Sequence, residues 1–443
     1  MNVDTKTAML KTEKAFRIVP VAKACSAFPV DFSFLNHGNR QFVAFYDEHR
    51  RLVTGSRQIG SGDFVFFQPE GRWVPGRHRS SNCTGFDSHN YLVMAVDSDG
   101  YLHLSGNMHS DPLVYFRSTR PLDVTSFVAV EKMVGAEEDE VTYPLFFNGS
   151  RGEFIFRYRD GGSGNGSDYY NIYNTKEQSW SRLLEQPVLG GEGQRNGYAR
   201  PPVMGPDGQW HLIWMWRETW DCETNNNLSY AKSPDLVHWQ HSDGTPVELP
   251  ITRSKGEIVD PAPVGGGLLN MVHEVGFDNA KRPILTYHRY DSNGHSQAYA
   301  ARLENRRWVV HQLSNWDFRW DFSGGGSIPR ELDLSNARPV GDGKIEVSYS
   351  SKAAGSGVWL ISEATMAVLE TRPPRPLLPE ALRNPRQGIH PDALVHAMTA
   401  GGDAAPDGQT HILRWETLPI NRDRPLGVDV IPTQLEVVEI PAD

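Results

Sequence analysis

Histidine, tyrosine and arginine recur at matching ends of successive strand–turn–strand segments in this sequence. His89 opens one such segment and His109 closes it, twenty residues later. Antiparallel pairing brings the two ends of a hairpin together, so both imidazoles are expected at one edge of a sheet. Each histidine taken alone is better explained as an ordinary loop residue. The pair at matched ends is what indicates a candidate site.

The next two segments carry a tyrosine and two arginines at the same positions. Tyr143 opens the segment that Arg159 closes, and Arg217 closes the segment after it. Alternation along the strand FIFRYR puts Arg157 and Arg159 on one face. The following residues 160–166, DGGSGNG, predict a small flexible loop that leaves space beside Arg159 for a bulky ligand. The plainer interpretation is a wide turn next to a surface arginine.

Further candidates for ligand contact lie near these ends. Trp216 offers the flat apolar surface that sugar-binding clefts use, although at least one tryptophan of WMWRETW suits a core position instead. Arg200 opens the same segment. His288 and Arg289 are weaker candidates for the same edge, as is Arg330.

These residue types favour chemistry on an anionic sugar. The candidates include no pair of carboxylates of the kind that most glycosidases use, no Ser–His–Asp arrangement and no phosphate-binding loop. Arginine or histidine donors can neutralise the carboxylate of a uronic acid, whose neighbouring proton is otherwise barely acidic. Tyrosine or histidine can take that proton and return one to the leaving oxygen. The pattern therefore predicts β-elimination at a uronate.

Seven strand–turn–strand segments position these residues and account for most of the 443-residue chain. Asp-Gly or glycine-rich turns between alternating apolar strands are strong hairpin signals. Such turns stand about sixty residues apart on average, somewhat further than in common propeller repeats, at His49–Arg50, Asp99–Gly100, Arg151–Gly152, Asp207–Gly208, Gly265, Asp342–Gly343 and Asp407–Gly408. We expect a single all-β domain, a seven-bladed β-propeller. A β-sandwich or a parallel β-helix fits this length and spacing less well.

The two ends of the chain lead to separate expectations. Residues 1–16 are polar and predict a flexible N-terminal segment, so the propeller is expected over residues 17–443. The last strand, TQLEVVEI, is expected to close the ring beside strand material near the N-terminus. Pairing of this kind would tie the two ends together.

Charge and composition narrow the class of protein. The net charge is −10 and no basic stripe appears, so nucleic-acid binding is not expected. No window approaches the roughly 18 apolar residues of a membrane span, and we expect a soluble monomer. Cys25, Cys83 and Cys222 are too isolated for a zinc site or a disulfide framework. No secretory signal is visible, which predicts a cytoplasmic protein, or a secreted or periplasmic one if a signal was removed.

Several stretches resemble the BNR-repeat family that contains the ulvan lyases and the rhamnosyl-glucuronate lyases. They are HNYLVMAVDSDGYLHLSGNMHSDPLVYFRS, VTYPLFF, FRYRDGGSGNG, and GYARPPVMGPDGQWHLIWMWRET followed by NLSYAKSPDLVHW. The resemblance runs from about residue 36 to residue 300, and its motifs are specific in combination. It implies a seven-bladed propeller and a polysaccharide lyase acting by β-elimination. The expected substrate is an anionic glycan with glucuronate linked to rhamnose, and the product an unsaturated uronate.

The resemblance also implies a role for each candidate. Tyr143 matches the family's catalytic tyrosine and would be the base, and also the acid. His109 would assist proton transfer, and the choice between Tyr143 and His109 as the base stays open. His89, Arg159 and Arg217 would hold the carboxylate.

The sequence departs from the family pattern in two places. Some ulvan lyases hold zinc with Cys and His just after the YR motif, but GGSGNGSDYYNIYN contains neither, so that metal is not expected. Relatives assigned as α-L-rhamnosidases carry a histidine where Arg40 stands, which weakens this hydrolase alternative. The chemistry requires no cofactor, and a structural calcium ion stays open. A non-catalytic sugar-binding propeller is the remaining alternative.

Overall fold

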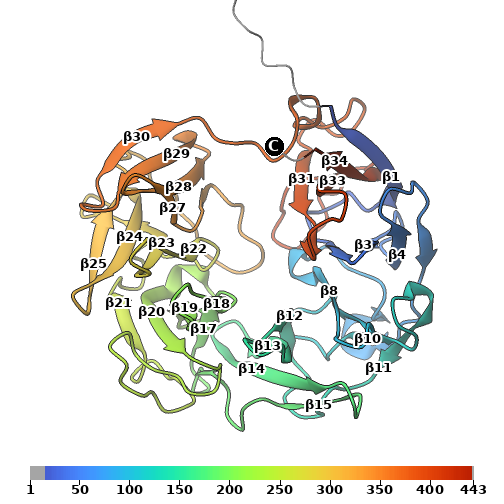
Figure 1. Cartoon of the computed structure of the whole chain (residues 1–443), viewed down its shortest axis with the longest axis horizontal. Coiled ribbons are helices and arrows are strands. Elements are labelled where there is room, and N and C mark those ends of the chain that lie inside the picture. Colours follow the sequence, from blue (N-terminus) through green and yellow to red (C-terminus); the bar gives the residue numbers. More distant parts are fainter. Residues whose placement is uncertain (1–14, 442–443) are drawn as a thin grey trace, which may run out of the picture.

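The structure is a computed structural model that describes residues 15–441. These residues form seven sheets of four or five strands and one two-stranded ribbon, with five short 3₁₀ turns as their helical content. No helix among them is long and apolar enough to cross a membrane. Figure 1 shows the sheets following one another around a common centre in chain order. The prediction of an all-β chain is confirmed.

Strands that are neighbours in sequence pair antiparallel within most sheets. The first sheet contains β2 (Ser33–His37), β3 (Arg40–Tyr46), β4 (Leu52–Gln58) and β5 (Val65–Phe67), with β32 (Gly401–Gly402) at its edge. The ribbon consists of β6 (Trp73–Val74) and β7 (Arg79–Ser80). The second sheet contains β8 (Leu92–Val96), β9 (Leu102–Gly106), β10 (Tyr115–Ser118) and β11 (Phe127–Val130).

The third and fourth sheets each add one short strand to a four-stranded path. The third contains β12 (Val141–Asn148), β13 (Phe154–Gly162), β14 (Asn165–Asn174), β15 (Ser179–Arg182) and β16 (Leu189–Gly190). The fourth contains β17 (Asn196–Ala199), β18 (Val203–Met204), β19 (Trp210–Arg217), β20 (Asn225–Ser233) and β21 (Glu257–Asp260).

The remaining three sheets complete the arrangement. The fifth contains β22 (His273–Phe277), β23 (Pro283–Tyr290), β24 (Ser296–Glu304) and β25 (Arg307–Gln312). The sixth contains β26 (Leu332–Leu334), β27 (Arg338–Gly341), β28 (Lys344–Ser351), β29 (Gly355–Ser362) and β30 (Val368–Arg372). The seventh contains β31 (Leu394–Thr399), β33 (Thr410–Thr417), β34 (Thr433–Ile440) and β1 (Arg17–Ala24). The 3₁₀ turns are η1 (Pro75–Arg77), η2 (Ser88–Asn90), η3 (Val124–Ser126), η4 (Cys222–Thr224) and η5 (Glu380–Leu382).

Six of the seven predicted turns lie where the chain reverses between antiparallel strands. Gly100 and Gly208 adopt φ values of 84° and 80°, the left-handed region that glycine enters without strain. The prediction around Gly265 is wrong, because β22 and β23 are joined by residues 278–282 instead. The glycines before β22 serve close packing. A Cβ on Gly267 would lie 2.6 Å from the ring of Tyr290.

The two ends of the described chain meet in the seventh sheet. β1 pairs antiparallel with β34, with Arg17 opposite Glu439, which confirms the predicted partner of TQLEVVEI. β32 pairs in parallel with β2 and links the seventh sheet to the first. Most of the predicted flexible segment, residues 1–16, lies outside the described residues, so the domain boundary stays a prediction.

The core lies between neighbouring sheets, and it contains all three tryptophans of β19, which are Trp210, Trp214 and Trp216. All eight residues of β19 are buried, and their side chains alternate between two faces. Trp214 and Trp216 pack into the apolar cluster shared with the third sheet, and Trp216 has no exposed surface. The prediction that Trp216 contacts substrate is therefore wrong, because Arg217 projects from the opposite face of the strand.

Candidate active site

One cavity of about 430 Å³ collects six of the nine predicted site residues. It is lined by strands of the second, third and fourth sheets and by loop residues around 270, 328 and 420. The six lining residues are His89, His109, Tyr143, Arg159, Arg200 and Arg217. The predicted convergence of hairpin ends on one site is therefore what the structure shows.

A 3₁₀ turn and a strand end place the two histidines. His89 lies in η2, and its own backbone N–H donates to the carboxylate of the N-cap residue Asp87 at 2.8 Å. His109 follows the end of β9, where Asn107 takes a left-handed φ of 58° and the side chain of Met108 is fully buried. The backbone N–H of His109 donates to Asp111 at 2.7 Å. The backbone of each histidine is thus held by a hydrogen bond to an aspartate.

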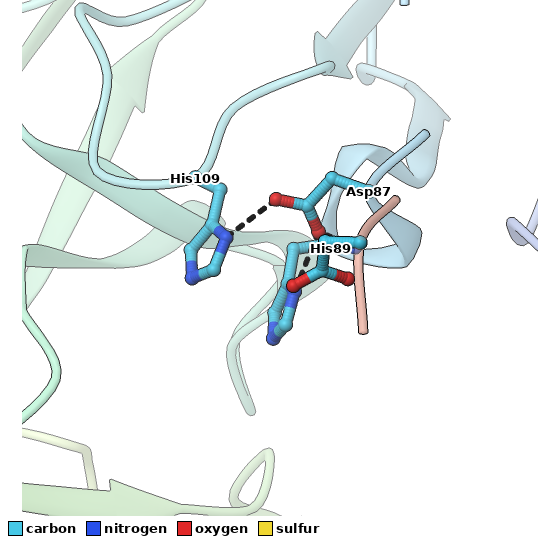
Figure 2. Close-up of side chains that lie close together, drawn as sticks. Asp87, His89 and His109 are labelled. Atoms are coloured by element: carbon cyan, nitrogen blue, oxygen red, sulfur yellow. Dashed lines mark hydrogen bonds and ion pairs between the residues drawn. The ribbon is translucent and has the colours of Figure 1, made fainter. Parts of the chain in front are cut away.

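A single carboxylate holds both imidazoles. Asp87 Oδ1 lies 2.7 Å from His89 Nδ1, and Asp87 Oδ2 lies 2.6 Å from His109 Nδ1 (Figure 2). The two rings are stacked with centroids 3.9 Å apart and planes 18° apart. Burial opposes ionisation of Asp87, but the two histidine donors outweigh it and hold the pKa of that carboxyl well below its usual value. Burial, opposed by Asp87, lowers the pKa of His109.

A β-bulge presents Tyr143 to the cavity. The pairing of β12 with β13 shifts register between Thr142 and Leu145, and Tyr143 adopts a left-handed φ of 58°. Its ring lies 5.7 Å from that of His89 and 6.1 Å from that of Tyr198. Burial, aided by the neighbouring Tyr198, raises the pKa of the Tyr143 phenol above its ordinary value. The group is therefore protonated at neutral pH.

Arg159 and Arg217 converge on the phenol oxygen of Tyr198. Arg159 Nη1 lies 3.4 Å and Arg217 Nη1 3.2 Å from Tyr198 Oη. Ser163 Oγ lies 2.7 Å from the same oxygen. Burial raises the pKa of Tyr198, but the guanidinium groups of Arg217 and Arg159 outweigh it, so that this pKa lies below its ordinary value. Tyr198 thus differs from Tyr143 in the direction of its shift.

Tyr198 is one of the site residues that the sequence reasoning missed. It lies in β17, the strand that opens the hairpin closed by Arg217, just as Tyr143 opens the hairpin closed by Arg159. The same positional rule that selected Tyr143 would have selected Tyr198. The sequence contained this signal, but the rule was applied to Tyr143 only.

The glycine-rich run beside Arg159 is a tight hairpin and not the predicted flexible loop. β13 continues to Gly162 and β14 begins at Asn165. A Cβ on Gly166 would lie 2.9 Å from Cδ of Arg159, and one on Gly164 would lie 2.7 Å from Cα of Thr219. The small residues therefore allow Arg159 and the neighbouring sheet to approach this hairpin closely.

Arg200 lines the cavity but is paired with a carboxylate. It forms an ion pair with Glu274, which leaves it less available to an anion than Arg159 or Arg217. Arg157 also lines the cavity, and its Nε donates to Asp168 at 2.9 Å. Arg330, one of the weaker candidates, reaches the cavity and pairs with Asp333 at 2.8 Å.

His288 and Arg289 do not reach this cavity, so their prediction as substrate contacts is not supported by the fold. His288 is fully buried, with its ring 5.2 Å from that of Trp320, and burial lowers its pKa to about 3. Arg289 donates to Asp260 at 2.6 Å and lies 4.2 Å from the ring centroid of Tyr299. Both side chains serve packing and pairing around the fifth sheet.

Among the described residues, one group of side chains beside the cavity could offer ligands to a metal ion. Asp87, His89, His109 and Asp423 offer nitrogen and oxygen atoms within 4.8 Å of one another, and such donors suit several divalent ions. However, both Nδ1 atoms contact Asp87, and the near-parallel rings direct their Nε2 atoms side by side (Figure 2). Such a geometry is that of a hydrogen-bonded pair and not of lone pairs converging on one ion. A structural calcium ion elsewhere in the fold therefore stays an untested expectation.

Comparison with known proteins places the chain in a family. The model of the BNR repeat-containing family matches residues 40–316. Because that match covers more than half of the chain, this protein belongs to the BNR-repeat family, as the sequence resemblance indicated.

Relatives of known activity extend this assignment. The short isoform of ulvan lyase from Alteromonas sp. (strain LOR) is 29% identical over 152 residues, or 31% of this chain. The match spans 28% of the length of that relative. The polysaccharide lyase Uly1 has a TM-score of 0.60 at 13% identity, with 99% of this chain and 94% of that chain covered. A PL25 ulvan lyase bound to -[GlcA(1-4)Rha3S]- has a TM-score of 0.61 at 14% identity, with 96% of each chain covered. These two structures share the fold of this chain.

Proposed function

We propose that this protein is a polysaccharide lyase that cleaves a glycan next to a uronic acid by β-elimination. One observation carries the proposal. Six arginines of the described chain are buried: Arg57, Arg157, Arg159, Arg217, Arg302 and Arg414. Four of them pair with carboxylates, whereas Arg159 and Arg217 have no carboxylate partner among the described residues. Both line the cavity.

A buried cation without a counter-ion is costly and is retained where an anion will bind. Arg159 is 2% exposed and its Nε has no hydrogen-bond partner among the described residues. The contacts of Arg159 and Arg217 with Tyr198 Oη are long for charge-assisted hydrogen bonds, at 3.4 and 3.2 Å. A uronate carboxylate fits this position and would replace these contacts with shorter ones. Neutralised in this way, it could delocalise the negative charge that forms when the adjacent proton leaves.

Proton transfer requires an acid and a base near the same place. Tyr143 suits the acid that protonates the leaving oxygen, because its raised pKa keeps it protonated at neutral pH. Two groups of the cavity can accept the proton from the sugar: His109, whose lowered pKa keeps it neutral, and Tyr198, whose pKa lies below its ordinary value. This division of roles replaces the expectation that Tyr143 serves as both acid and base.

We further propose glucuronate linked to rhamnose as the substrate. The family resemblance supports this glycan, and so does the oligosaccharide bound by the PL25 ulvan lyase of similar fold. The seven sheets, together with the pairing of β1 and β34, support the interpretation of residues 17–443 as one seven-bladed propeller.

The direct test is the ultraviolet absorbance of a conjugated unsaturated uronate. Purified protein is incubated with a panel of uronate-containing glycans, and absorbance and new reducing ends are followed together. We expect both to rise in parallel on a glucuronate–rhamnose glycan, and Arg159→Ala to abolish both. New reducing ends without absorbance would contradict elimination, and free rhamnose without absorbance would support the rhamnosidase alternative. Binding without turnover on the whole panel would support a non-catalytic role.

A further inference from the structure

We infer that Asp87 is a positioning residue that fixes His89 and His109, the rim histidines, in one tautomer and makes them a unit that accepts a single proton. This inference rests on the proposed function only for its role in the reaction. The geometry of the three side chains is independent of any substrate.

The direction of the two hydrogen bonds fixes the tautomer. An ionised carboxylate has no hydrogen to donate, so each Nδ1 must carry the hydrogen of its contact with Asp87. The contacts measure 2.7 Å to His89 and 2.6 Å to His109. A neutral imidazole with a hydrogen on Nδ1 has its lone pair on Nε2. Asp87 is itself held in place, because its Oδ1 also accepts the backbone N–H of His89.

The Nε2 atoms are left for the cavity. No hydrogen bond involves Nε2 of either ring in the described part of the chain, and both rings line the cavity. The side chains of His89 and His109 are 19% and 24% exposed, so the rings are confined without being sealed from a ligand. An imidazole held by a carboxylate at one nitrogen and free at the other is the arrangement of a general base.

Charge limits the pair to one proton. The first proton on Nε2 forms an imidazolium whose charge is balanced by Asp87. A second would place two cations in rings only 3.9 Å apart. Other charged or titratable groups facing the pair come from several elements: Arg159 of β13, Tyr143 of β12, Asp111 and Arg77 behind His109, and Asp423 of the loop before β34. Arg159 adds a further positive charge and reinforces the limit.

The proton balance of the elimination follows from this arrangement. The C5–H bond of the uronate breaks, its proton goes to Nε2 of His109, and its electron pair forms the C4–C5 double bond. The C4–O bond breaks with its electron pair on oxygen, and Tyr143 supplies the proton that this oxygen takes. We assign the acceptor to His109 because Arg159, which would hold the carboxylate next to C5, donates from Nη2 at 3.2 Å to Oγ of Ser110, the residue that follows His109.

The tautomers can be read without any substrate. Histidine labelled with ¹⁵N gives nitrogen shifts that identify which ring atom carries hydrogen, and His89→Gln and His109→Gln assign the two rings. We expect both rings to carry hydrogen on Nδ1 at alkaline pH and the pair to gain one proton as the pH falls to about 5. In Asp87→Asn, at least one ring should change tautomer. Hydrogen on Nε2 of either ring of the wild type at alkaline pH, or unchanged tautomers in Asp87→Asn, would overturn the inference.

Kinetics tests the role in the reaction. Asp87→Asn should lower kcat on the order of 10²- to 10⁴-fold with KM nearly unchanged, because the arginines that bind the carboxylate are untouched. The limb of the pH profile that reports the base should shift or disappear. A matched control is Asp207→Asn, which removes another histidine-bound carboxylate, that of His211, outside the cavity. It should leave both the rim tautomers and the pH profile as in the wild type.

Two outcomes would overturn the role as base. If Tyr198→Phe removes the basic limb of the pH profile while His109→Gln retains it, Tyr198 takes the proton. If stoichiometric Zn²⁺ binds to the wild type, fails to bind to Asp423→Asn and raises kcat, the cluster is a metal centre. The nuclear magnetic resonance result stands even when no glycan is cleaved, so failure of the proposed function and failure of this inference are distinguishable.

Discussion

Two sets of histidines that are bound to aspartate, one beside the cavity and one in buried turns, differ in tautomer. The rim histidines use Nδ1 toward Asp87 and leave Nε2 free. Three other residues, the turn histidines, use Nε2 toward the aspartate of a preceding turn: His103 with Asp97, His211 with Asp207 and His411 with Asp407. Their Nδ1 atoms contact Tyr115, Tyr230 and Gln41 at 2.7, 2.7 and 2.9 Å.

This difference separates the histidines that can contact a ligand from the histidines that only stabilise the fold. The side chains of the turn histidines are 0–1% exposed and both ring nitrogens are occupied, so that they have nothing left to exchange with a ligand. Each secures an Asp-Gly turn to the strand that follows it. The rim histidines share one carboxylate between two rings, and Nε2 of each ring has no hydrogen bond in the described part of the chain. Residue type alone does not distinguish the two groups, whereas the occupied nitrogen does.

Removing a rim histidine should have the largest effect on turnover. We expect His109→Ala to lower kcat on the order of 10²- to 10⁴-fold, since the ring is placed to transfer a proton. Its free energy of unfolding should change by less than about 1 kcal/mol, because the ring is partly exposed. Initial rates from ultraviolet absorbance and urea denaturation measure the two quantities. Loss of the fold in this variant would contradict the distinction between rim histidines, which affect turnover, and turn histidines, which affect stability.

Removing a turn histidine should have the opposite result. His103→Ala removes one hydrogen-bond partner each from a buried carboxylate and a buried phenol, and it opens space beside Trp180 and Phe154. We expect it to lower the free energy of unfolding by about 2–4 kcal/mol. Turnover per folded molecule should stay within about twofold of the wild type, in keeping with its distance from the chemistry. A loss of turnover comparable to that of His109→Ala would contradict the comparison.

Acid should weaken the pair of His103 and Asp97. Burial lowers the pKa of His103, against the effect of Asp97, so the unfolded chain takes a proton there before the folded chain does. Burial opposes ionisation of Asp97, but its hydrogen bonds from His103 and the backbone outweigh burial and lower its pKa. In both cases the unfolded state binds more protons, and stability falls as the pH falls, first below about 6.5 and then below about 4.

Urea denaturation at several pH values measures this dependence. Wild type should lose stability steadily from pH 7 toward pH 4, and Asp97→Asn should show a flatter dependence from a lower starting point. Equal slopes in the two proteins would mean that other groups govern the acid response.

The smallest expected effect is that of metal removal. Under the proposed function, Arg159 and Arg217 would supply the positive charge that a uronate needs, so we expect dialysis against a chelator to leave kcat within about twofold of its initial value. Turnover lost to the chelator and restored by Ca²⁺ or Zn²⁺ would assign a metal to the protein.

The sequence predicted what local rules control. Glycine-containing turns such as Asp99–Gly100 and Arg151–Gly152 reverse the chain because glycine enters the left-handed region freely. The hairpins that they form bring His89, His109, Tyr143, Arg159 and Arg217 to one cavity. The same rules did not place Trp216 correctly. The sheet that contains it packs against a neighbouring sheet on each side, so both faces of its strand are buried. Alternation from Arg217 would have assigned Trp216 to the core.

What the sequence did not predict depends on contacts between distant segments. Asp423 reaches the rim histidines from a loop more than three hundred residues away, held by Ser327, whose backbone N–H donates to it at 3.0 Å. His288 and Arg289 resemble the site residues in type and in position near a strand end, yet their sheet directs them to Trp320 and Asp260. Asp87 carried a local signal, the Asp-Ser-His spacing, that went unused.

The pairing of β1 with β34 has a consequence for how the protein is made. Of the described strands, β1 leaves the ribosome before the others and β34 after them, so β1 waits for its partner until the strands of the other six sheets have been made. Until then its unpaired edge can join other strands, including those of neighbouring nascent chains. Ile420, which lines the cavity, is also made after the strands of the other six sheets. Assembly of the sheet and completion of the cavity are therefore late events, and a chain released before Thr433 has neither β34 nor a partner for β1.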